Sequence, residues 1–562
     1  MLSYRKLAMR VLGRPLHTGG SNSPRPASQR AAAFALTAAM LITLAAPAFA
    51  ETWYIENGDI TVKASGTEGK NKVSQGNNPE VEDTDTIITN SNKNTASSHT
   101  VTIEANGKND KVEVTLKDVN IDTSSRNNAA VSVTGSGNTT IKLDGDNHLT
   151  GGISDNGSYG LSGISSSGSL TISGGETDSL TAQGGSGTDG SGGRGIFSKD
   201  LTISGGTVNA NGGDGKNGSG GSGITSLGSL TISGGTVNAA GGDGTNSSDG
   251  GDGITNNRGV TISSGGTVTA KGGSGEDGSG GRGISSFGGV TISSGGTVTA
   301  TGGNSTGSDG SGGDGISSTS TTISGGTVTA DGGSGNFSGG NGIRSFDVAI
   351  SGGTVNVAGG NGGNGSRSDV GNGIISNGID LSGSLELTAK AGSPNGKALS
   401  QNGKELGLNT IKDKLGPGAK VTTTDADGKV IDQVPIPRPV EPEKPVIPED
   451  SSSSSDGGSS APSAPTSPLP GLTVTDKDGQ RISYTSTQSG NTLTVCVGRF
   501  TASLRISLAT LRQLRAEGIE TITFQTLLCS TTLSVDELLA MGGEDAEAVL
   551  THRSTDSSLT VG

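Results

Sequence analysis

A unit of about 30 residues repeats through the middle of the chain. The phrase LTISGG begins at Leu170, Leu201 and Leu230, and related phrases follow until the last, AISGG, begins at Ala349. Its isoleucine recurs at intervals of 27 to 31 residues, at Ile172, Ile203, Ile232, Ile262, Ile292, Ile323 and Ile350. Such a period is typical of a solenoid, in which each unit buries its apolar residues only by stacking on its neighbours.

Each unit contains three short apolar segments, Gly-Ile-x-Ser, LTIS and TV-x-A. Leu170 and Ile172 point to one side of their segment and Thr171 to the other, which is the alternation of a half-buried strand. Glycine pairs separate the segments where tight turns need positive φ. A second isoleucine ladder starts each unit, at Ile164, Ile196, Ile224, Ile254, Ile284, Ile316, Ile343 and Ile374.

These patterns predict an all-β fold, a right-handed parallel β-helix of about ten coils with three strands in each coil. No proline occurs between Pro79 and Pro394, as expected for continuous sheet, because proline cannot donate to a strand ladder. The composition of 101 Gly, 29% hydrophobic and 2% aromatic residues excludes an ordinary globular core. Disorder would also fit that composition, but the fixed period favours a thin, repetitive core.

The first fifty residues are predicted to be a signal peptide. They carry six basic and no acidic residues, an apolar run from Ala31 to Ala46, and Ala48-Phe49-Ala50 before Glu51. We therefore expect a secreted protein with no membrane segment after cleavage, and a retained anchor is the alternative. Cleavage would take the net charge from −14 to −20. Such acidity argues against nucleic acid and anionic membranes as partners and is compatible with divalent cations.

Proline marks the domain boundaries, since ten of the seventeen lie between Pro435 and Pro470. Residues 433–470 are thus predicted to be a disordered Pro/Ser-rich linker after a β-helix of residues 51–432. Trp53 would help to cover the first coil, and the less regular residues 381–424 would close the other end. Residues 471–562 combine strand-like and helix-like segments and predict a small α+β domain, whose Cys496 and Cys529 are either paired or two free thiols.

Residues 112–360 resemble a clostridial family of secreted β-helical carbohydrate-binding domains. The phrases that carry the resemblance are VTLKDVNI, AAVSV, TTIKLDGDNHL and GIFSKDLTISGGTVNANGG. The resemblance implies binding of acidic plant polysaccharides such as pectin, with Ca²⁺ held by side-chain and backbone oxygens. The last domain resembles small modules at the ends of secreted clostridial surface proteins, which implies association with a cell wall or cell surface.

The chain departs from the family at the residue before each Gly-Ile. Many members carry an acid there, as do Asp252 and Asp314, but other coils have Arg194, Ser222, Arg282 or Asn341. Only some coils could then supply a carboxylate, which puts a regular calcium ladder in doubt. Oxygen ligands without Cys or His clusters favour Ca²⁺ over zinc. The candidate ligands are Asp189, Asp214, Asp243, Asp252, Asp277 and Asp314.

Two Gly-rich loops begin like a calcium-binding nonapeptide repeat. GGSGTDGSG from Gly184 and GGSGEDGSG from Gly272 have Gly-Gly-x-Gly-x-Asp, but Ser191 and Ser279 replace the large apolar residue at the eighth position. We interpret these loops as solvated turns, with calcium binding as the alternative. The acidic residues 79–86 have the same two interpretations, a solvated loop or a calcium site near the capped end.

The function expected from these features is non-catalytic binding of an extracellular polysaccharide, acidic in one interpretation. No coil groups the carboxylates or the basic residue that hydrolases and lyases need, so we expect no enzyme activity. Aromatic stacking is limited by the few Trp and Tyr residues, so recognition would use repeated weak contacts from outward residues such as Asn209 and Asn238. The alternatives are a structural stalk or adhesin-like surface protein and a polysaccharide lyase.

Overall fold

The computed structural model describes residues 51–435, except 68, 156, 294 and 364–370. It also describes residues 471–561, except 477–478, 483, 490, 498–500, 527–529, 542–545 and 553–556. The predicted signal peptide and nearly all of the predicted linker lie outside the described residues. Among the helices that are described, none is long and apolar enough to cross a membrane.

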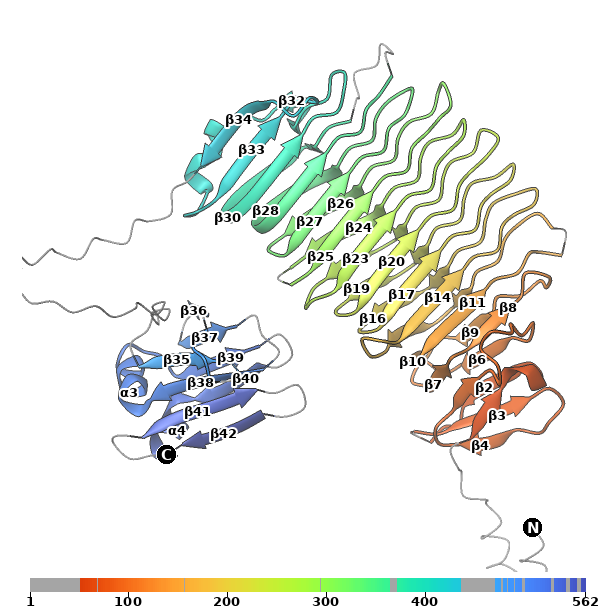
Figure 1. The fold of residues 1–562 in the computed structure, drawn as a ribbon, viewed down its shortest axis with the longest axis horizontal. Helices are drawn as coiled ribbons and strands as arrows, with labels where there is room; N and C mark the ends of the chain where they lie inside the picture. The colour runs from red at the N-terminus through yellow and green to blue at the C-terminus, as the bar shows by residue number, and fades with distance from the viewer. Residues whose placement is uncertain are drawn as a thin grey trace, which may run out of the picture.

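The first part of the chain is a parallel β-helix, as the repeat predicts (Figure 1). It has about 13 turns, more than the ten expected. Residues stack in register from coil to coil, so that Leu201 pairs with Leu230 and Ile203 with Ile232. The segment before the regular repeats contains β1 (Thr52–Tyr54), β2 (Ile60–Ala64), β3 (Asn71–Gln75), β4 (Val81–Asp83), β5 (Ile87–Thr89), β6 (Val101–Ala105), β7 (Lys111–Lys117), β8 (Asn120–Asp122), β9 (Val131–Gly135), β10 (Asn138–Asp144) and β11 (Asp146–Thr150).

The three predicted segments of each unit form three columns of strands. The Gly-Ile column contains β12 (Ile164–Ser166), β15 (Ile196–Ser198), β18 (Ile224–Ser226), β21 (Ile254–Asn256) and β29 (Ile374–Ser376). The LTI column contains β13 (Ser169–Ser173), β16 (Asp200–Ile203), β19 (Ser229–Ile232) and β22 (Gly259–Ile262). The TV column contains β14 (Ser179–Gln183), β17 (Thr207–Asn211), β20 (Thr236–Ala240), β23 (Thr267–Lys271), β25 (Thr297–Thr301) and β27 (Thr327–Asp331). Longer strands join two or three columns: β24 (Ile284–Ile292), β26 (Ile316–Ile323), β28 (Ile343–Ala358) and β30 (Gly378–Lys390).

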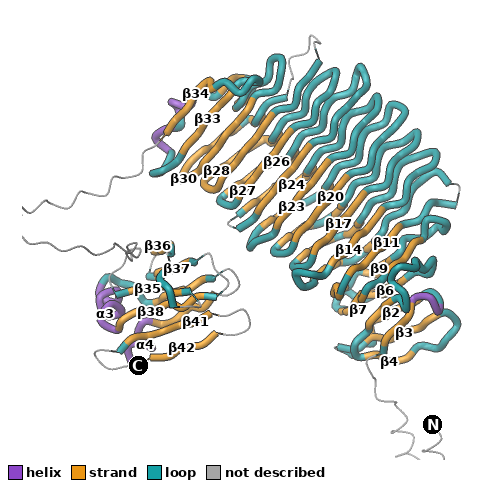
Figure 2. The backbone as a smooth tube through the Cα atoms, in the orientation of Figure 1, coloured by secondary structure: helices purple, strands orange, loops and turns teal. Residues whose placement is uncertain are grey.

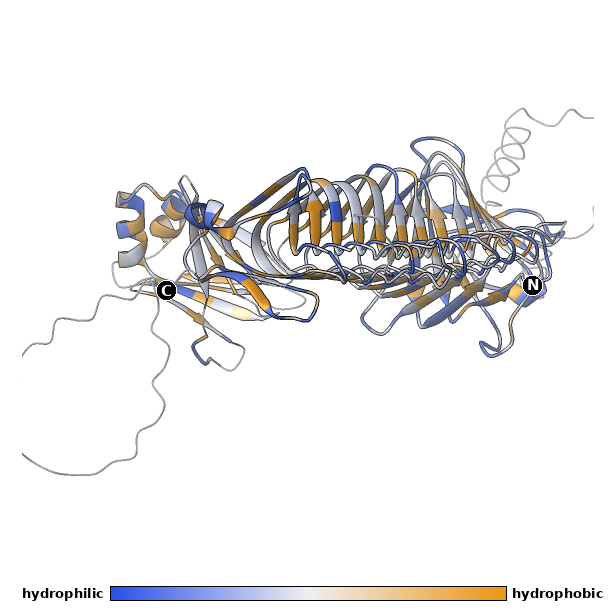
Figure 3. Cartoon of the chain, turned by 90° about the horizontal axis from the view of Figure 1, so that it is seen from above, coloured by the Kyte–Doolittle hydropathy of each residue, from blue (hydrophilic) through white to orange (hydrophobic). Residues whose placement is uncertain are grey.

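The core lies inside the three columns. In one coil the side chains of Ile224, Leu230, Ile232 and Val237 are all fully buried. Apolar positions recur from coil to coil along the stack (Figure 3). The interior is therefore a set of aliphatic ladders, whose free energy of burial accumulates with each added coil.

A Gly-rich lobe leaves the core between each TV strand and the next Gly-Ile strand (Figure 2). Its two legs pack backbone against backbone: the amide of Gly213 donates to the carbonyl of Gly193, and Gly221 donates to Gly213, both at 2.8 Å. A Cβ on Gly213 would lie 2.0 Å from the carbonyl oxygen of Gly185 in the preceding coil. Our interpretation of these loops as solvated turns therefore fits only their tips, since the legs form a buried glycine spine.

Non-repetitive strands cover both ends of the β-helix. At the start, β3 pairs antiparallel with β2 and β4, which ends the parallel ladder. Trp53 is buried there, and its Nε1 donates to Asp83 Oδ2 at 2.8 Å, so part of the acidic segment 79–86 is structural. The other end contains β31 (Leu399–Gln401), β32 (Lys404–Glu405), β33 (Lys420–Thr424) and β34 (Val430–Pro435). There β33 and β34 pair antiparallel.

Residues 471–561 form the small α+β domain that the sequence predicts. One four-stranded sheet contains β35 (Leu472–Thr475), β38 (Ala502–Ser507), β41 (Glu547–His552) and β42 (Ser557–Val561). The other contains β36 (Thr485–Ser489), β37 (Thr492–Cys496), β39 (Thr521–Gln525) and β40 (Ser530–Ser534). Two helices pack with them, α3 (Leu508–Ala516) and α4 (Val535–Met541), and Ser507 caps α3 by accepting from the amide of Thr510. Cys496 is a free thiol, and Cys529 lies outside the described residues.

Candidate functional site

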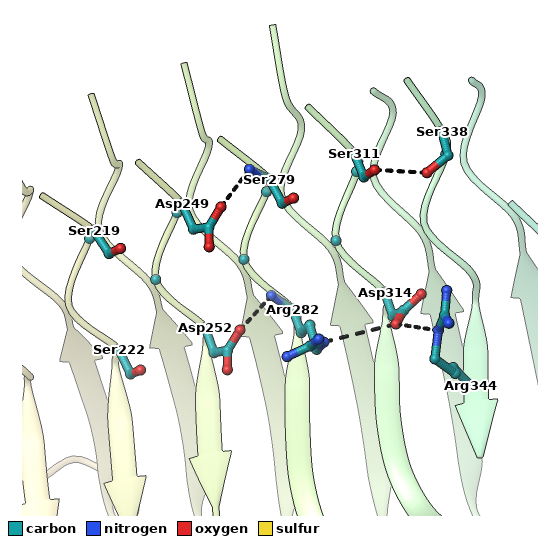
Figure 4. A pocket seen from close by; sticks show the side chains of 18 residues that line it. Ser219, Ser222, Asp249, Asp252, Ser279, Arg282, Ser311, Asp314, Ser338 and Arg344 are labelled. Atoms are coloured by element: carbon teal, nitrogen blue, oxygen red, sulfur yellow. Dashed lines mark hydrogen bonds and ion pairs between the residues drawn. The ribbon is translucent and has the colours of Figure 1, made fainter. Parts of the chain in front are cut away.

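A groove of about 540 Å³ crosses five successive coils where the Gly-rich lobe returns to the Gly-Ile column (Figure 4). It is lined by the repeated phrase Ser-Gly-Gly-x-Gly-Ile and its variants. The paired glycines contribute no side chains, so the polar residues on either side of them line an open channel. Those residues are Ser219, Asp249, Ser279, Ser311 and Ser338 in one row, Ser222, Asp252, Arg282 and Asp314 in the next, and Arg344.

Asp252 is held by donors from its own coil and the next. Its Oδ1 accepts from the backbone amide of Arg282 at 2.7 Å, and its Oδ2 accepts from the Thr255 hydroxyl at 3.0 Å. Burial raises the pKa of the Asp252 carboxyl, although these donors and the charge of Arg282 act in the opposite direction. The carboxylate therefore links two neighbouring coils at the base of the groove.

Asp314 makes the corresponding link two coils further on. Its Oδ1 accepts from the backbone amide of Asn341 at 2.8 Å and from Asn341 Nδ2 at 2.7 Å. Its Oδ2 accepts from Arg344 Nε at 2.9 Å, and Arg282 Nε lies 3.9 Å from the same oxygen. Asn341 repeats the pattern by accepting from the amide of Asn372 at 3.0 Å. The residues before Gly-Ile thus form a side-chain ladder, in which an Asp or Asn oxygen accepts from the backbone amide of the next coil.

The other candidate calcium ligands lie in the Gly-rich lobes, outside the groove. Asp214 accepts from the amide of Asp243 at 2.9 Å, and Asp243 accepts from the amide of Ser274 at 2.6 Å. Asp189 accepts from Asn217 Nδ2 at 2.7 Å. Asn304 takes the place of these acids in a later coil and accepts from the amide of Ser334 at 2.8 Å. Because the neutral side chain of Asn304 accepts the same kind of hydrogen bond, this bond does not depend on the negative charge of an aspartate.

The six candidate calcium ligands come from several coils and lie in the lobes and in the groove. Within the part of the chain that the structure describes, no group of three or more His, Cys, Asp and Glu side chains is placed to hold a metal ion. Asp277 is exposed at a lobe tip, while Asp252 and Asp314 line the groove, and in each of them one carboxylate oxygen accepts from a backbone amide of the next coil. The observed role of most of these acids is to join coils, and calcium binding stays a prediction.

Asn209 and Asn238, the predicted glycan contacts, lie on the TV column and outside the groove. They stack in register on β17 and β20, and Asn238 Nδ2 donates to Asn209 Oδ1 at 2.8 Å. Both side chains are half-buried, and the same row continues with Thr269, Thr299 and Thr329. The row is a regular polar surface, separate from the groove.

Three exposed apolar side chains, none of them Trp or Tyr, are additional candidates for stacking on a sugar ring. Phe287, Phe346 and Leu227 are 73%, 64% and 44% exposed. Each lies three residues after the isoleucine that begins its Gly-Ile strand. Alternation along the strand could have found them, because the isoleucine and the residue two positions later point inward.

No protein-family model, curated protein or solved structure matches the chain. The resemblance to clostridial carbohydrate-binding domains therefore stays a prediction.

Proposed function

We propose that this chain is a secreted, non-catalytic protein that binds an extracellular polysaccharide along its β-helix. The observation that carries the proposal is the open groove that crosses five coils and is lined by hydroxyl, carboxylate and guanidinium groups. A polymer lying along such a groove meets similar donors and acceptors at each coil. Many weak contacts on one rigid surface then add up to useful avidity.

The bonding of the groove acids favours binding over catalysis. A glycosidase needs one carboxyl group to donate a proton and another to act as base or nucleophile. The acids Asp252 and Asp314 are instead fixed by the backbone of the following coil, and Asn341 replaces them in the same ladder. An amide cannot exchange a proton in this way, so the shared role of the position is to join coils.

The charge of the groove bears on the kind of polysaccharide. Three aspartates and two arginines line it, in a chain of net charge −14. An acidic polysaccharide would therefore be repelled unless divalent cations bridged its carboxylates to the protein. A neutral polysaccharide needs no such bridge.

A polysaccharide array tests the proposal with the purified protein, in calcium and in chelator. We expect retention on at least one extracellular polysaccharide, with calcium dependence only if the glycan is acidic. Ser279→Trp would fill the middle of the groove and abolish retention. Thr299→Trp, a matched change on the TV column, would leave retention intact.

Each other outcome points to a different site or a different function. Loss of retention in Thr299→Trp alone would move the site to the row of Asn209 and Asn238. An absence of retention on every glycan would leave the structural stalk as the better account. Unsaturated products that absorb in the near ultraviolet would identify a polysaccharide lyase.

A further inference from the structure

Exposed apolar side chains recur at every second coil along one edge of the Gly-Ile column. The strands β18, β21, β24, β26 and β28 stack in register through Ser226, Asn256, Ser286, Ser318 and Ser345. The residues that follow these five are Leu227, Asn257, Phe287, Thr319 and Phe346, all exposed. Apolar and polar side chains thus alternate along this row, which we call the corner row.

The register sets the spacing of the three apolar side chains. Neighbouring strands of a sheet are about 4.8 Å apart, so side chains two coils apart are about 9.6 Å apart. Leu227, Phe287 and Phe346 therefore recur at about this interval along the stack, with one register shift between β24 and β26, where β24 carries an extra residue between Ser286 and Gly289.

The corner row lies beside the groove and spans the same coils. Arg344 lines the groove and Phe346 belongs to the row, and both point outward from β28 because they are two residues apart on one strand. At the other end, Ser222 lines the groove in the coil that carries Leu227. One surface thus combines a line of apolar contacts with a parallel channel of hydroxyl and charged groups.

The corner row is too small and too interrupted to be a protein interface. An aromatic side chain buries at most about 250 Å², so three apolar side chains remain well below the roughly 1,200 Å² of a stable protein–protein contact. Polar Asn257 and Thr319 also separate the apolar residues. A flat ligand that places one apolar face on every second coil fits this pattern better.

We propose that the corner row and the groove together bind an extended, neutral β-1,4-linked polysaccharide. In such a chain successive pyranose rings are turned over, so the same ring face recurs at every second sugar. That repeat is close in length to two coils of the β-helix. The apolar ring faces stack on Leu227, Phe287 and Phe346, while hydroxyl groups along one side of the chain bond to the groove.

The near balance of charge in the groove supports a neutral ligand. Asp314 is paired with Arg344 and lies near Arg282, so the polar groups act mainly as hydrogen-bond partners for sugar hydroxyls. This inference rests on the proposed function, because it specifies the glycan and the contacts of the same surface.

Calorimetric titration of the full protein with two hexasaccharides tests the inference. Cellohexaose is β-1,4-linked and extended, whereas maltohexaose is α-1,4-linked and curved. We expect cellohexaose to bind and maltohexaose to bind at least about tenfold more weakly. The double variant Phe287→Ala/Phe346→Ala should weaken cellohexaose binding at least about tenfold. Tyr159→Ala, which removes an aromatic side chain that is 56% exposed outside the groove lining, should leave it unchanged.

The result can separate this inference from the broader proposal. If the protein is retained on some polysaccharide but the double variant binds as tightly as wild type, the corner row is not the site and only the inference fails. Equal affinity for the two hexasaccharides would also overturn it. Light scattering that shows a dimer in wild type and a monomer in the double variant would assign the row to self-association and overturn it. If no polysaccharide is retained at all, the proposed function itself fails.

Discussion

The glycine spine predicts that one added methyl group will separate two coils. A Cβ on Gly251 would lie 2.0 Å from the carbonyl oxygen of Gly221 and 2.8 Å from that of Gly220, both in the preceding coil. Ordinary contacts of a Cβ begin near 3.4 Å, so the backbone must shift by more than an ångström. The shift would stretch the 2.8 Å bonds that Gly251 makes to Gly242 and Gly273.

The expected cost follows from these contacts. Overpacking of a rigid interior costs about 1–3 kcal/mol, and each weakened hydrogen bond adds about 1 kcal/mol. Gly251→Ala should therefore destabilise the β-helix by about 3–5 kcal/mol. Gly259→Ala is the matched control in the same coil, because its Cβ would meet only the carbonyl of Gly289 at 3.5 Å. There the added methyl should be neutral or stabilise by up to about 1 kcal/mol, since glycine weakens a strand.

Urea unfolding followed by circular dichroism compares the two variants with wild type. We expect a lower midpoint for Gly251→Ala and an unchanged or higher midpoint for Gly259→Ala. Hydrogen exchange should in addition show faster exchange of the Gly251 and Gly273 amides in the first variant. Equal midpoints for both variants would refute the close packing of the two legs.

Three further predictions concern the core, the groove ladder and the first coils. Ile262→Ala removes a fully buried side chain and should cost about 2–5 kcal/mol in urea unfolding; a cost below 1 kcal/mol would contradict the ladder core. Asp314→Asn keeps an acceptor for the Asn341 amide but loses the acceptor for Arg344 Nε, so it should cost about 1 kcal/mol, whereas Asp314→Ala loses both acceptors and should cost about 2–4 kcal/mol. Burial opposes ionisation of Asp59, but hydrogen bonds from Arg126 and Thr100 outweigh it and lower its pKa to about 2. The lowered pKa of Asp59 stabilises the fold by about 1 kcal/mol after discounting for solvent screening. This stabilisation should be present above about pH 4 and lost as the pH falls to about 2. Thermal melts should show that Asp59→Asn abolishes this pH dependence.

The regular part of the fold could be predicted because its strand pattern lies within each unit of about 30 residues and repeats from unit to unit. Ile203 and Ile232 occupy equivalent places in successive units, and period-two alternation assigns both to the core. The expected count of ten turns was too low. The antiparallel pairing of β3 with β2 has no counterpart in the repeat, so nothing in the period indicates it.

The candidate site could be predicted only in part because its residues come from different coils. Asp252 and Asp314 were singled out from their shared place before Gly-Ile, but the role predicted for them was metal binding. The ladder that they form depends on amides of the following coil, which only the stacked structure brings near. Strand alternation predicts that Phe287 and Phe346 point outward, but their place beside the groove depends on the stacking of the coils.

The most direct test of polysaccharide binding along the groove is the equilibrium affinity of wild type and Ser279→Trp for a polysaccharide that the array retains. Glycan binding in the groove predicts saturable binding by wild type and at least about tenfold weaker binding by the variant. Circular dichroism should show the same fold for both proteins. Equal affinities, or no saturable binding by wild type to any polysaccharide, would contradict the proposed function.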